Sequence, residues 1–237
     1  MFDLSGKTAL VTGGTSGIGA AIANGLATAG CQVLAAGLPA DKAAGKLNPD
    51  IEVASVDVAD ADGIRLLVAN LAHLDILVNS AGIIRRRTEY ELDVFERVID
   101  VNLTGTMRMC IACRPLLAKN GGSIINVASM LSFFGAGLAP AYSASKGGVA
   151  QLTKSLAIAW GTDNIRVNAV APGWIATPLT QTLQDDPTRS ATILARTPIG
   201  RWGQPEDVVG AVVFLCSPAA AFITGIVLPV DGGYLIT

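Results

Sequence analysis

The sequence predicts an α/β fold, a single doubly wound parallel sheet with helices on both faces. Short, almost continuously apolar runs alternate along the chain with longer segments of helical spacing. Strands that are apolar throughout are typical of a parallel sheet covered on both faces. The first apolar run leads through a glycine-rich turn into a helical segment. There is no linker, repeat or low-complexity segment, so we predict one Rossmann-like domain over residues 1–237.

Seven apolar runs are expected to form the strands, and right-handed crossovers would join them. The expected strands are 9–12, 32–36, 52–56, 76–79, 123–128, 166–170 and 226–229. The expected helices are 20–29, 64–71, 95–118, 144–161 and 205–215. Ligands of such sheets bind beyond the carboxyl ends of the strands. The polar and glycine residues that follow the strands are therefore the candidate site: Gly13, Asp57, Asn79, Ser129, Pro172 and Gly173.

Composition excludes several classes of function. Hydrophobic residues make up 51% of the 237 residues and charged residues 15%, which predicts apolar subunit contacts and an oligomer, a homotetramer by resemblance to the family named below. The net charge is −2, and the arginines at 85–87 are too short a cluster for a nucleic-acid backbone. We expect no membrane partner, since no apolar stretch reaches spanning length and no leader peptide begins the chain. These features predict a cytoplasmic protein.

The four cysteines predict buried thiols rather than a metal site. Cys110 and Cys113 have the spacing of half a zinc site, but no second pair exists and His73 is remote in sequence. Unpaired core thiols are typical of a reducing compartment.

The glycine turn predicts a nucleotide site. Gly13, Thr15, Ser16, Gly17, Ile18 and Gly19 lie between the first strand and the first helix. Glycines let a backbone approach a pyrophosphate, and a helix N-terminus offers free N–H groups and a positive dipole end. A purely structural glycine turn is the alternative interpretation.

Tyr142 and Lys146 predict acid–base chemistry. They are four residues apart, so on a helix the phenol and the ammonium share one face. A cation beside a phenol lowers its pKa from about 10 toward neutral pH. Such a tyrosine can exchange a proton with a hydroxyl or carbonyl group. Ser129 could hold the reacting oxygen, although it could instead be a helix cap.

These motifs together resemble the short-chain dehydrogenase/reductase family over essentially the whole chain. The glycine turn is similar to the cofactor turn of that family, and residues 79–82, Asn-Ser-Ala-Gly, are similar to its Asn-Asn-Ala-Gly motif. Asn102, Ser129, Tyr142 and Lys146 match its catalytic tetrad. The resemblance implies that Tyr142 is the acid/base, that Lys146 lowers its pKa and holds the nicotinamide ribose, and that Asn102 supports a proton relay. Asn102 could instead mark a helix bend, and Asn79 a turn at a strand end.

The resemblance also implies the remaining cofactor contacts. Asp57 and Val58 resemble the pair that contacts adenine. Asn79, Ala81 and Gly82 fall in the second motif, and Pro172, Gly173, Ile175 and Thr177 resemble the segment that clasps the carboxamide. The second strand ends at Gly37 and Leu38, which offer neither an acid for ribose hydroxyls nor a cation for a 2′-phosphate. Lys42 follows closely, but the sequence does not indicate in which direction its side chain points after Pro39. We therefore expect NAD, with NADP not excluded.

The substrate is expected to be a small molecule with a secondary alcohol or ketone. The closest resemblance is to sugar-acid dehydrogenases of the 2-deoxy-gluconate and gluconate type, so a sugar acid or small polyol is predicted. Arg85 could pair with a substrate carboxylate, with Ser129 and Tyr142 at the reacting carbon, and the segment 177–200 could be a lid. Two alternatives stay open: a 3-oxoacyl-thioester reductase, and a nucleotide-binding regulator without catalysis.

Overall fold

Seven parallel strands form one sheet, as the sequence predicts. A computed structural model describes residues 2–38 and 47–237, and Lys42 lies outside them. The strand order is β3-β2-β1-β4-β5-β6-β7, and the register runs parallel between all neighbours. The strands are β1 Thr8–Thr12, β2 Gln32–Gly37, β3 Glu52–Ser55, β4 Ile76–Asn79, β5 Gly122–Val127, β6 Ile165–Pro172 and β7 Val227–Val230. The doubly wound order places a switch point between β1 and β4, where ligands bind in such sheets.

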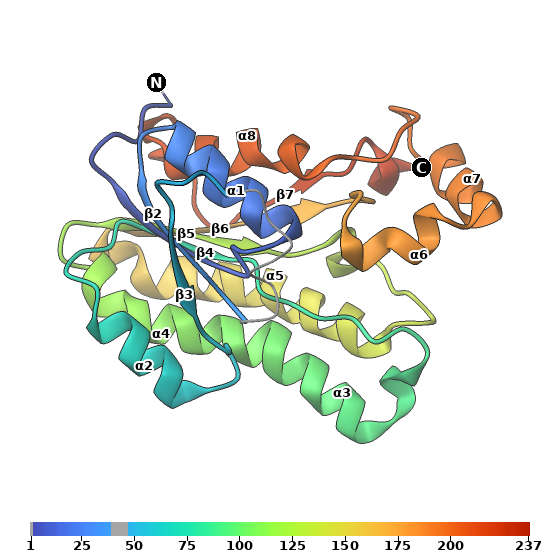
Figure 1. The fold of residues 1–237 in the computed structure, drawn as a ribbon, viewed down its shortest axis with the longest axis horizontal. Coiled ribbons are helices and arrows are strands. Elements are labelled where there is room, and N and C mark those ends of the chain that lie inside the picture. Colours follow the sequence, from blue (N-terminus) through green and yellow to red (C-terminus); the bar gives the residue numbers. More distant parts are fainter. Residues whose placement is uncertain (1, 39–46) are drawn as a thin grey trace.

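Helices cover both faces of the sheet (Figure 1). Helices α1 and α8 lie together on one face, and α2, α3, α4 and α5 lie on the other. The helices are α1 Gly17–Thr28, α2 Ala61–Ala69, α3 Leu92–Ile99, α4 Gly105–Leu117, α5 Pro140–Trp160, α6 Gln181–Gln184, α7 Pro187–Ala195 and α8 Pro205–Cys216. Among residues 2–38 and 47–237 no helix combines the length and the apolar character that crossing a membrane requires.

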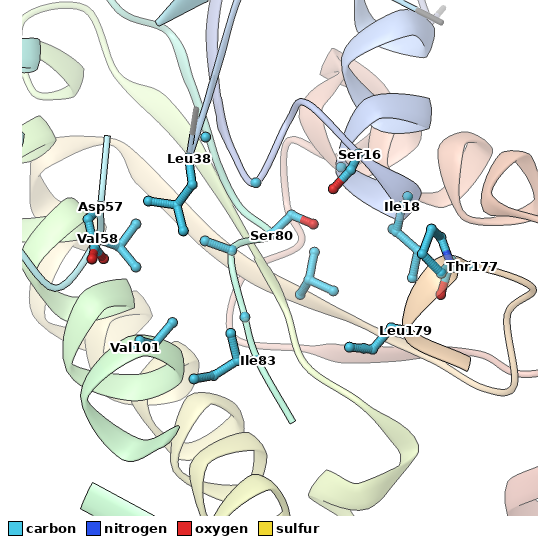
Figure 2. A pocket seen from close by; sticks show the side chains of 18 of the residues that line it. Ser16, Ile18, Leu38, Asp57, Val58, Ser80, Ile83, Val101, Thr177 and Leu179 are labelled. Carbon is cyan, nitrogen blue, oxygen red and sulfur yellow. The ribbon is translucent and has the colours of Figure 1, made fainter. Parts of the chain in front are cut away.

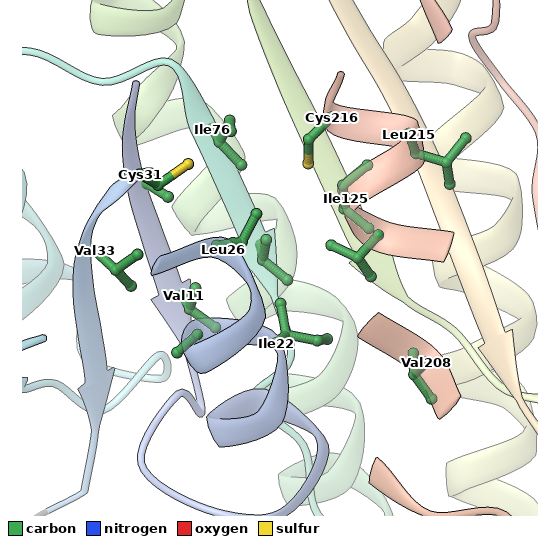
Figure 3. Packing of buried hydrophobic residues seen from close by; sticks show 14 of the residues in the cluster. Val11, Ile22, Leu26, Cys31, Val33, Ile76, Ile125, Val208, Leu215 and Cys216 are labelled. Atoms are coloured by element: carbon green, nitrogen blue, oxygen red, sulfur yellow. The ribbon is translucent and has the colours of Figure 1, made fainter. Parts of the chain in front are cut away.

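Alternate residues of the central strands enter cores on the two faces of the sheet, because successive side chains of a strand point to opposite faces. Val11 of β1 packs with Ile22 and Leu26 of α1 and with Val208 of α8 (Figure 3). Leu10 joins the core on the other face, beneath α2, α4 and α5. Burying each such aliphatic side chain contributes roughly 1.5–3 kcal/mol. The two cores hold the sheet rigid and so fix the carboxyl ends of the strands.

The segment expected to be one helix over 95–118 is interrupted. Helix α3 passes into a π-helical turn at Asp100–Thr104 before α4 begins. Such turns insert one extra residue and are frequent at functional sites. The π-helical turn contains Asn102, so this residue lies at the irregularity between α3 and α4.

Helix α5 begins earlier than the predicted residue 144. Pro140 occupies its first turn, where a missing N–H costs nothing. Tyr142 therefore lies in the first helical turn and Lys146 one turn later, on the same face.

The segment 177–200 contains two helices that were not predicted. Asp186 accepts hydrogen bonds from the Thr188 and Arg189 N–H groups and caps α7, with Pro187 in the first turn. Both helices are short, so the apolar spacing that reveals longer helices is weak here.

Candidate active site

A cavity of about 530 Å³ opens at the carboxyl ends of β1, β2 and β4. Figure 2 shows side chains from both halves of the sheet converging on it. Many of the predicted residues line it: Gly13, Ser16, Gly17, Ile18, Gly19, Leu38, Asp57, Val58, Ala81, Gly82, Arg85, Tyr142, Lys146 and Thr177. The cavity is within the size range of cofactor sites.

The glycine turn has the form that a dinucleotide requires. Gly13 has φ +63°, and a Cβ there would lie 2.8 Å from the Ala81 backbone nitrogen. Ser16 is the N-cap of α1, but its hydroxyl makes no capping hydrogen bond and faces the cavity. Thr15 is 2% exposed, and its hydroxyl has no partner among the described residues. A buried unpartnered hydroxyl is costly, so this turn fits a polar ligand such as the ribose and phosphate of a dinucleotide.

Asp57, which is expected to contact adenine, is held by hydrogen bonds from other protein groups. Its carboxylate accepts hydrogen bonds from the Ala59 N–H at 2.9 Å and from Arg97 of α3 at 3.1 Å. Burial alone would raise the pKa of Asp57, but these two hydrogen bonds lower it below the usual value. Arg97 also lines the cavity, so a cation that the sequence analysis did not identify lies at this end.

Tyr142 faces the cavity as predicted, but its pKa differs from the prediction. Burial raises the pKa of the phenol above its usual value, and this effect exceeds the lowering by a hydrogen bond with Ser129 and by the charge of Arg86. The Lys146 ammonium lies 5.6 Å from the Tyr142 ring centroid. The pKa of Tyr142 is thus raised in this structure, where the sequence analysis expected Lys146 to lower it. The charge of Arg86 lowers the pKa of the phenol.

Lys146 is 4% exposed and donates a 2.6 Å hydrogen bond to the Val127 carbonyl at the end of β5. Burial lowers the pKa of its ammonium to about 8. A lysine in this state can exchange protons close to neutral pH.

Asn102 lies below the cavity and is completely buried. Its amide accepts from the Ile83 N–H at 2.8 Å and donates to the Ile83 carbonyl at 2.9 Å and to Ser145 at 3.1 Å. The two bonds to Ile83 hold the loop after β4, which carries Gly82. The side chain is thus held by protein groups, and its part in a proton relay stays a prediction.

Several predicted cofactor residues do not line the cavity. Asn79 donates to Asn126 at 2.9 Å inside the sheet, so it ties β4 to β5. Pro172 ends β6 and Gly173 follows it, where a Cβ on Gly173 would lie 2.7 Å from Asp231. Ile175 belongs to the apolar core. Only Thr177 of that segment reaches the cavity, because the preceding residues are held by packing.

The loop after β4 carries Arg85, the arginine that the sequence analysis assigned to substrate, and Arg86, a further arginine of the 85–87 cluster. Arg85 lines the cavity, but its side chain is exposed and donates to the Ile84 carbonyl at 3.1 Å. Arg86 is half-buried and donates to the Leu179 carbonyl, in the segment 177–200, at 3.4 Å. Burial lowers the pKa of Arg86, while Tyr142 and Glu89 raise it and Arg189 lowers it. Glu89, which the sequence analysis did not identify, is buried beside Arg86.

The other lining residues that were not predicted are mostly apolar. They are Gly37, Val56, Ser80, Ile83, Val101, Val127, Pro178 and Leu179. Within the part of the chain that the structure describes, no group of three or more His, Cys, Asp or Glu residues could hold a metal ion.

Fold and site together define an oxidoreductase that acts on CH–OH groups with a nicotinamide cofactor. A family model described as enoyl-(acyl carrier protein) reductase matches residues 13–235. Over 246 residues the chain is 43% identical to the 2-dehydro-3-deoxy-D-gluconate 5-dehydrogenase of Escherichia coli (strain K12), covering 99% of this chain and 97% of the relative. The chain belongs to the short-chain dehydrogenase/reductase family, as the motifs predict.

Two further relatives extend this result. The cis-4-hydroxycyclohexanecarboxylate dehydrogenase of Sinomonas cyclohexanicum is 43% identical over 242 residues, with 96% of each chain covered. The crystal structure of a gluconate 5-dehydrogenase from Burkholderia cenocepacia J2315, in complex with NADP and tartrate, is similar with a TM-score of 0.93. It shares 36% identity, with 100% of this chain and 98% of that chain covered. All three names specify a hydroxylated or oxidised carboxylic acid.

Proposed function

We propose that this protein interconverts a secondary alcohol and a ketone on a small hydroxylated carboxylic acid, a sugar acid in particular. The observation that carries the proposal is the half-buried Arg86 guanidinium. It interacts electrostatically with the Tyr142 phenol and donates a hydrogen bond to the Leu179 carbonyl in the segment 177–200. Guanidinium and carboxylate form paired, charge-assisted hydrogen bonds. A substrate carboxylate at Arg86 would place a carbon of the same molecule near Tyr142.

The chain supplies the proton chemistry of this reaction. When bound, the nicotinamide supplies the hydride acceptor or donor. Tyr142 takes the hydroxyl proton in oxidation and returns it in reduction, and Ser129 holds the same oxygen by hydrogen bonding. Lys146, with its pKa lowered to about 8 by burial, holds the ribose and exchanges protons with Tyr142. We infer that residues 177–200, with α6 and α7, act as the lid that excludes water.

Arg86 is a better candidate than Arg85 for the carboxylate. The Arg85 guanidinium returns to its own loop at Ile84, and its side chain is exposed. The two residues are therefore a matched pair for mutagenesis. Losing charge-assisted hydrogen bonds of about 1.5–3 kcal/mol corresponds to roughly a 10- to 100-fold loss of kcat/KM.

The test compares Arg86→Ala and Arg85→Ala on an acid substrate and on the matching neutral polyol. We expect Arg86→Ala to lose about 10- to 100-fold in kcat/KM on the acid and little on the polyol. Arg85→Ala should stay close to wild type. Equal losses on both substrates, or a larger loss in Arg85→Ala, would reject the assignment.

We infer that NADP is the cofactor, in place of the NAD expected from the sequence. The described end of β2 presents Gly37 and Leu38, and no acid there would repel a 2′-phosphate. The Ser16 hydroxyl makes no capping hydrogen bond, and Ser16 lines the cavity. The Burkholderia cenocepacia relative was solved with NADP. The ratio of kcat/KM for NADP and NAD tests this inference, and a ratio below one would restore NAD.

A 3-oxoacyl-thioester reductase is the second candidate, since the family model carries an acyl carrier protein reductase description. Arg85 lines the cavity beside Tyr142, and a cation there suits an acid better than an acyl chain. Turnover of acyl thioesters without turnover of any hydroxy acid would favour this candidate.

We also propose a cytoplasmic homotetramer. The helices α4 and α5 expose Ile111 and Ile158, the latter 85% exposed, and such apolar side chains are commonly buried between subunits. All four cysteines are free and buried, as suits a reducing compartment. Sedimentation velocity should give a tetramer, and Ile158→Glu should dissociate it. A monomer in wild type would contradict this proposal.

A further inference from the structure

The catalytic helix α5 takes its N-terminal cap from another part of the chain. Its N-cap residue is Ala139, which has no side-chain oxygen. The first N–H groups of a helix need acceptors. The Tyr142 N–H finds one in the Glu89 carboxylate, at 2.9 Å and 53 positions away in sequence. The backbone of Tyr142 is thus hydrogen-bonded to the loop that carries the arginines.

The other oxygen of the same carboxylate holds that loop. It accepts from the Arg85 N–H at 2.8 Å, and the Glu89 N–H donates back to the Arg85 carbonyl at 3.2 Å. Two more bonds join the loop to the residues before α5. The Arg87 N–H donates to the Leu138 carbonyl, and the Tyr90 hydroxyl donates to the Gly137 carbonyl, both at 2.8 Å.

The burial of Glu89 is informative, because a buried carboxylate without partners is strongly unfavourable. Its side chain is 1% exposed. The structure provides two N–H donors, the positive end of α5 and the neighbouring Arg86 charge. This residue therefore connects the proposed carboxylate-binding arginine with the proposed acid/base.

We propose that Glu89 is a positioning residue that locks Tyr142 and the Arg86 loop into one geometry for the reaction. The inference rests on the proposed function, since it assigns Arg86 to substrate and Tyr142 to proton transfer. Hydride and proton transfer need near-contact geometry at two points of one substrate. A single carboxylate that bonds both segments sets the distance between those points.

Charges on several elements face the Tyr142 phenol. On the loop, Arg86 lowers and Glu89 raises the pKa of Tyr142, and Ser129, after β5, lowers it by hydrogen bonding. Lys146 lies one turn along α5. Removing the Glu89 charge should therefore lower the pKa of Tyr142. That shift shows that the Glu89 charge lies close to the phenol, and the positioning role itself is tested by a variant that keeps the charge and shortens the side chain.

The experiment compares Glu89→Gln with Glu91→Gln, a matched change at an exposed glutamate in the same segment whose side chain makes no capping bond. Phenolate absorbance is followed against pH, and the same titration of Tyr142→Phe is subtracted to isolate Tyr142. We expect Glu89→Gln to move the titration to lower pH and to reduce kcat/KM about tenfold, because one N–H loses its acceptor. Glu91→Gln should match wild type.

A second variant keeps the test decisive if Glu89→Gln fails to fold. Glu89→Asp keeps the charge but is one methylene shorter, so it cannot bond both N–H groups. It should lose rate and retain most of the wild-type titration. An unmoved titration in folded Glu89→Gln, or an unaffected rate in Glu89→Asp, would overturn the proposal. Because the titration needs no substrate, it separates this inference from an incorrect assignment of the sugar acid.

Discussion

Lys146 is expected to destabilise the fold that carries it. Burial lowers the pKa of its ammonium from the usual 10.5 to about 8. At about 1.4 kcal/mol per pH unit, this difference corresponds to about 3 kcal/mol of penalty for the charged form in the folded state. Lys146→Met removes the charge and nearly keeps the side-chain length. It also removes the hydrogen bond to Val127, which costs about 0.5–1.5 kcal/mol. The variant should therefore be about 2 kcal/mol more stable than wild type at pH 7.

The sign of this effect with pH follows from proton binding. Between pH 8 and 10.5 the unfolded chain keeps the Lys146 proton while the folded chain has lost it. The wild-type free energy of unfolding therefore gains a rising contribution over that interval, and the variant lacks it. The advantage of Lys146→Met should be complete below pH 8 and should have fallen by about 3 kcal/mol by pH 10.5.

Urea unfolding of wild type and variant at pH 7, 8, 9 and 10 measures this difference, and contributions from the other titrating groups cancel in it. Lys154→Met is the control, since Lys154 is exposed on the same helix and its variant should show no pH-dependent difference. A Lys146→Met difference that is constant from pH 7 to 10 would refute the reasoning.

Two further predictions concern the glycine turn and the thiols. Gly19→Ala would put a Cβ 2.1 Å from the Gly13 carbonyl oxygen, so it should destabilise the protein by about 1–3 kcal/mol and weaken dinucleotide binding. Gly210→Ala, with open space around it, should be neutral or stabilising in thermal melts and cofactor titrations; equal behaviour of the two variants would contradict the packing argument. Burial raises the pKa of Cys31, Cys110 and Cys216 to about 12, so an aromatic disulfide reagent at pH 8 should label the native protein slowly and the unfolded protein at once. Rapid labelling of native protein would show that these thiols are accessible.

The strands and the glycine turn could be predicted because local sequence determines them. Apolar runs located all seven strands to within two residues at either end. The spacing of Tyr142 and Lys146 also predicted their shared helical face. Two features could not be predicted from the sequence, because they depend on tertiary structure. The pKa of Tyr142 is raised where the sequence analysis expected it to be lowered, because burial of the phenol, which no local pattern encodes, exceeds the effect of the nearby groups that lower it.

Glu89 illustrates a second limit of sequence reasoning. In the sequence it is one charged residue in a polar loop, where exposure is the usual outcome. Its partner N–H belongs to Tyr142, far along the chain. The available signal was indirect: a helix that begins at Pro140 after an alanine lacks a local cap. A missing cap is a reason to search loops at the same sheet edge for an acid.

The central claim is that Tyr142 performs the proton transfer of a nicotinamide-linked oxidation of a hydroxy acid. The most direct measurement is nicotinamide absorbance against time, with NADP and with NAD, over a panel of sugar acids and polyols. Wild type and Tyr142→Phe are compared, with cofactor affinity measured in parallel. We predict turnover of an acid by wild type, and a loss of about 100-fold or more in Tyr142→Phe with cofactor binding retained. Cofactor binding without any turnover by wild type, or undiminished turnover by Tyr142→Phe, would contradict the account and favour a nucleotide-binding regulator.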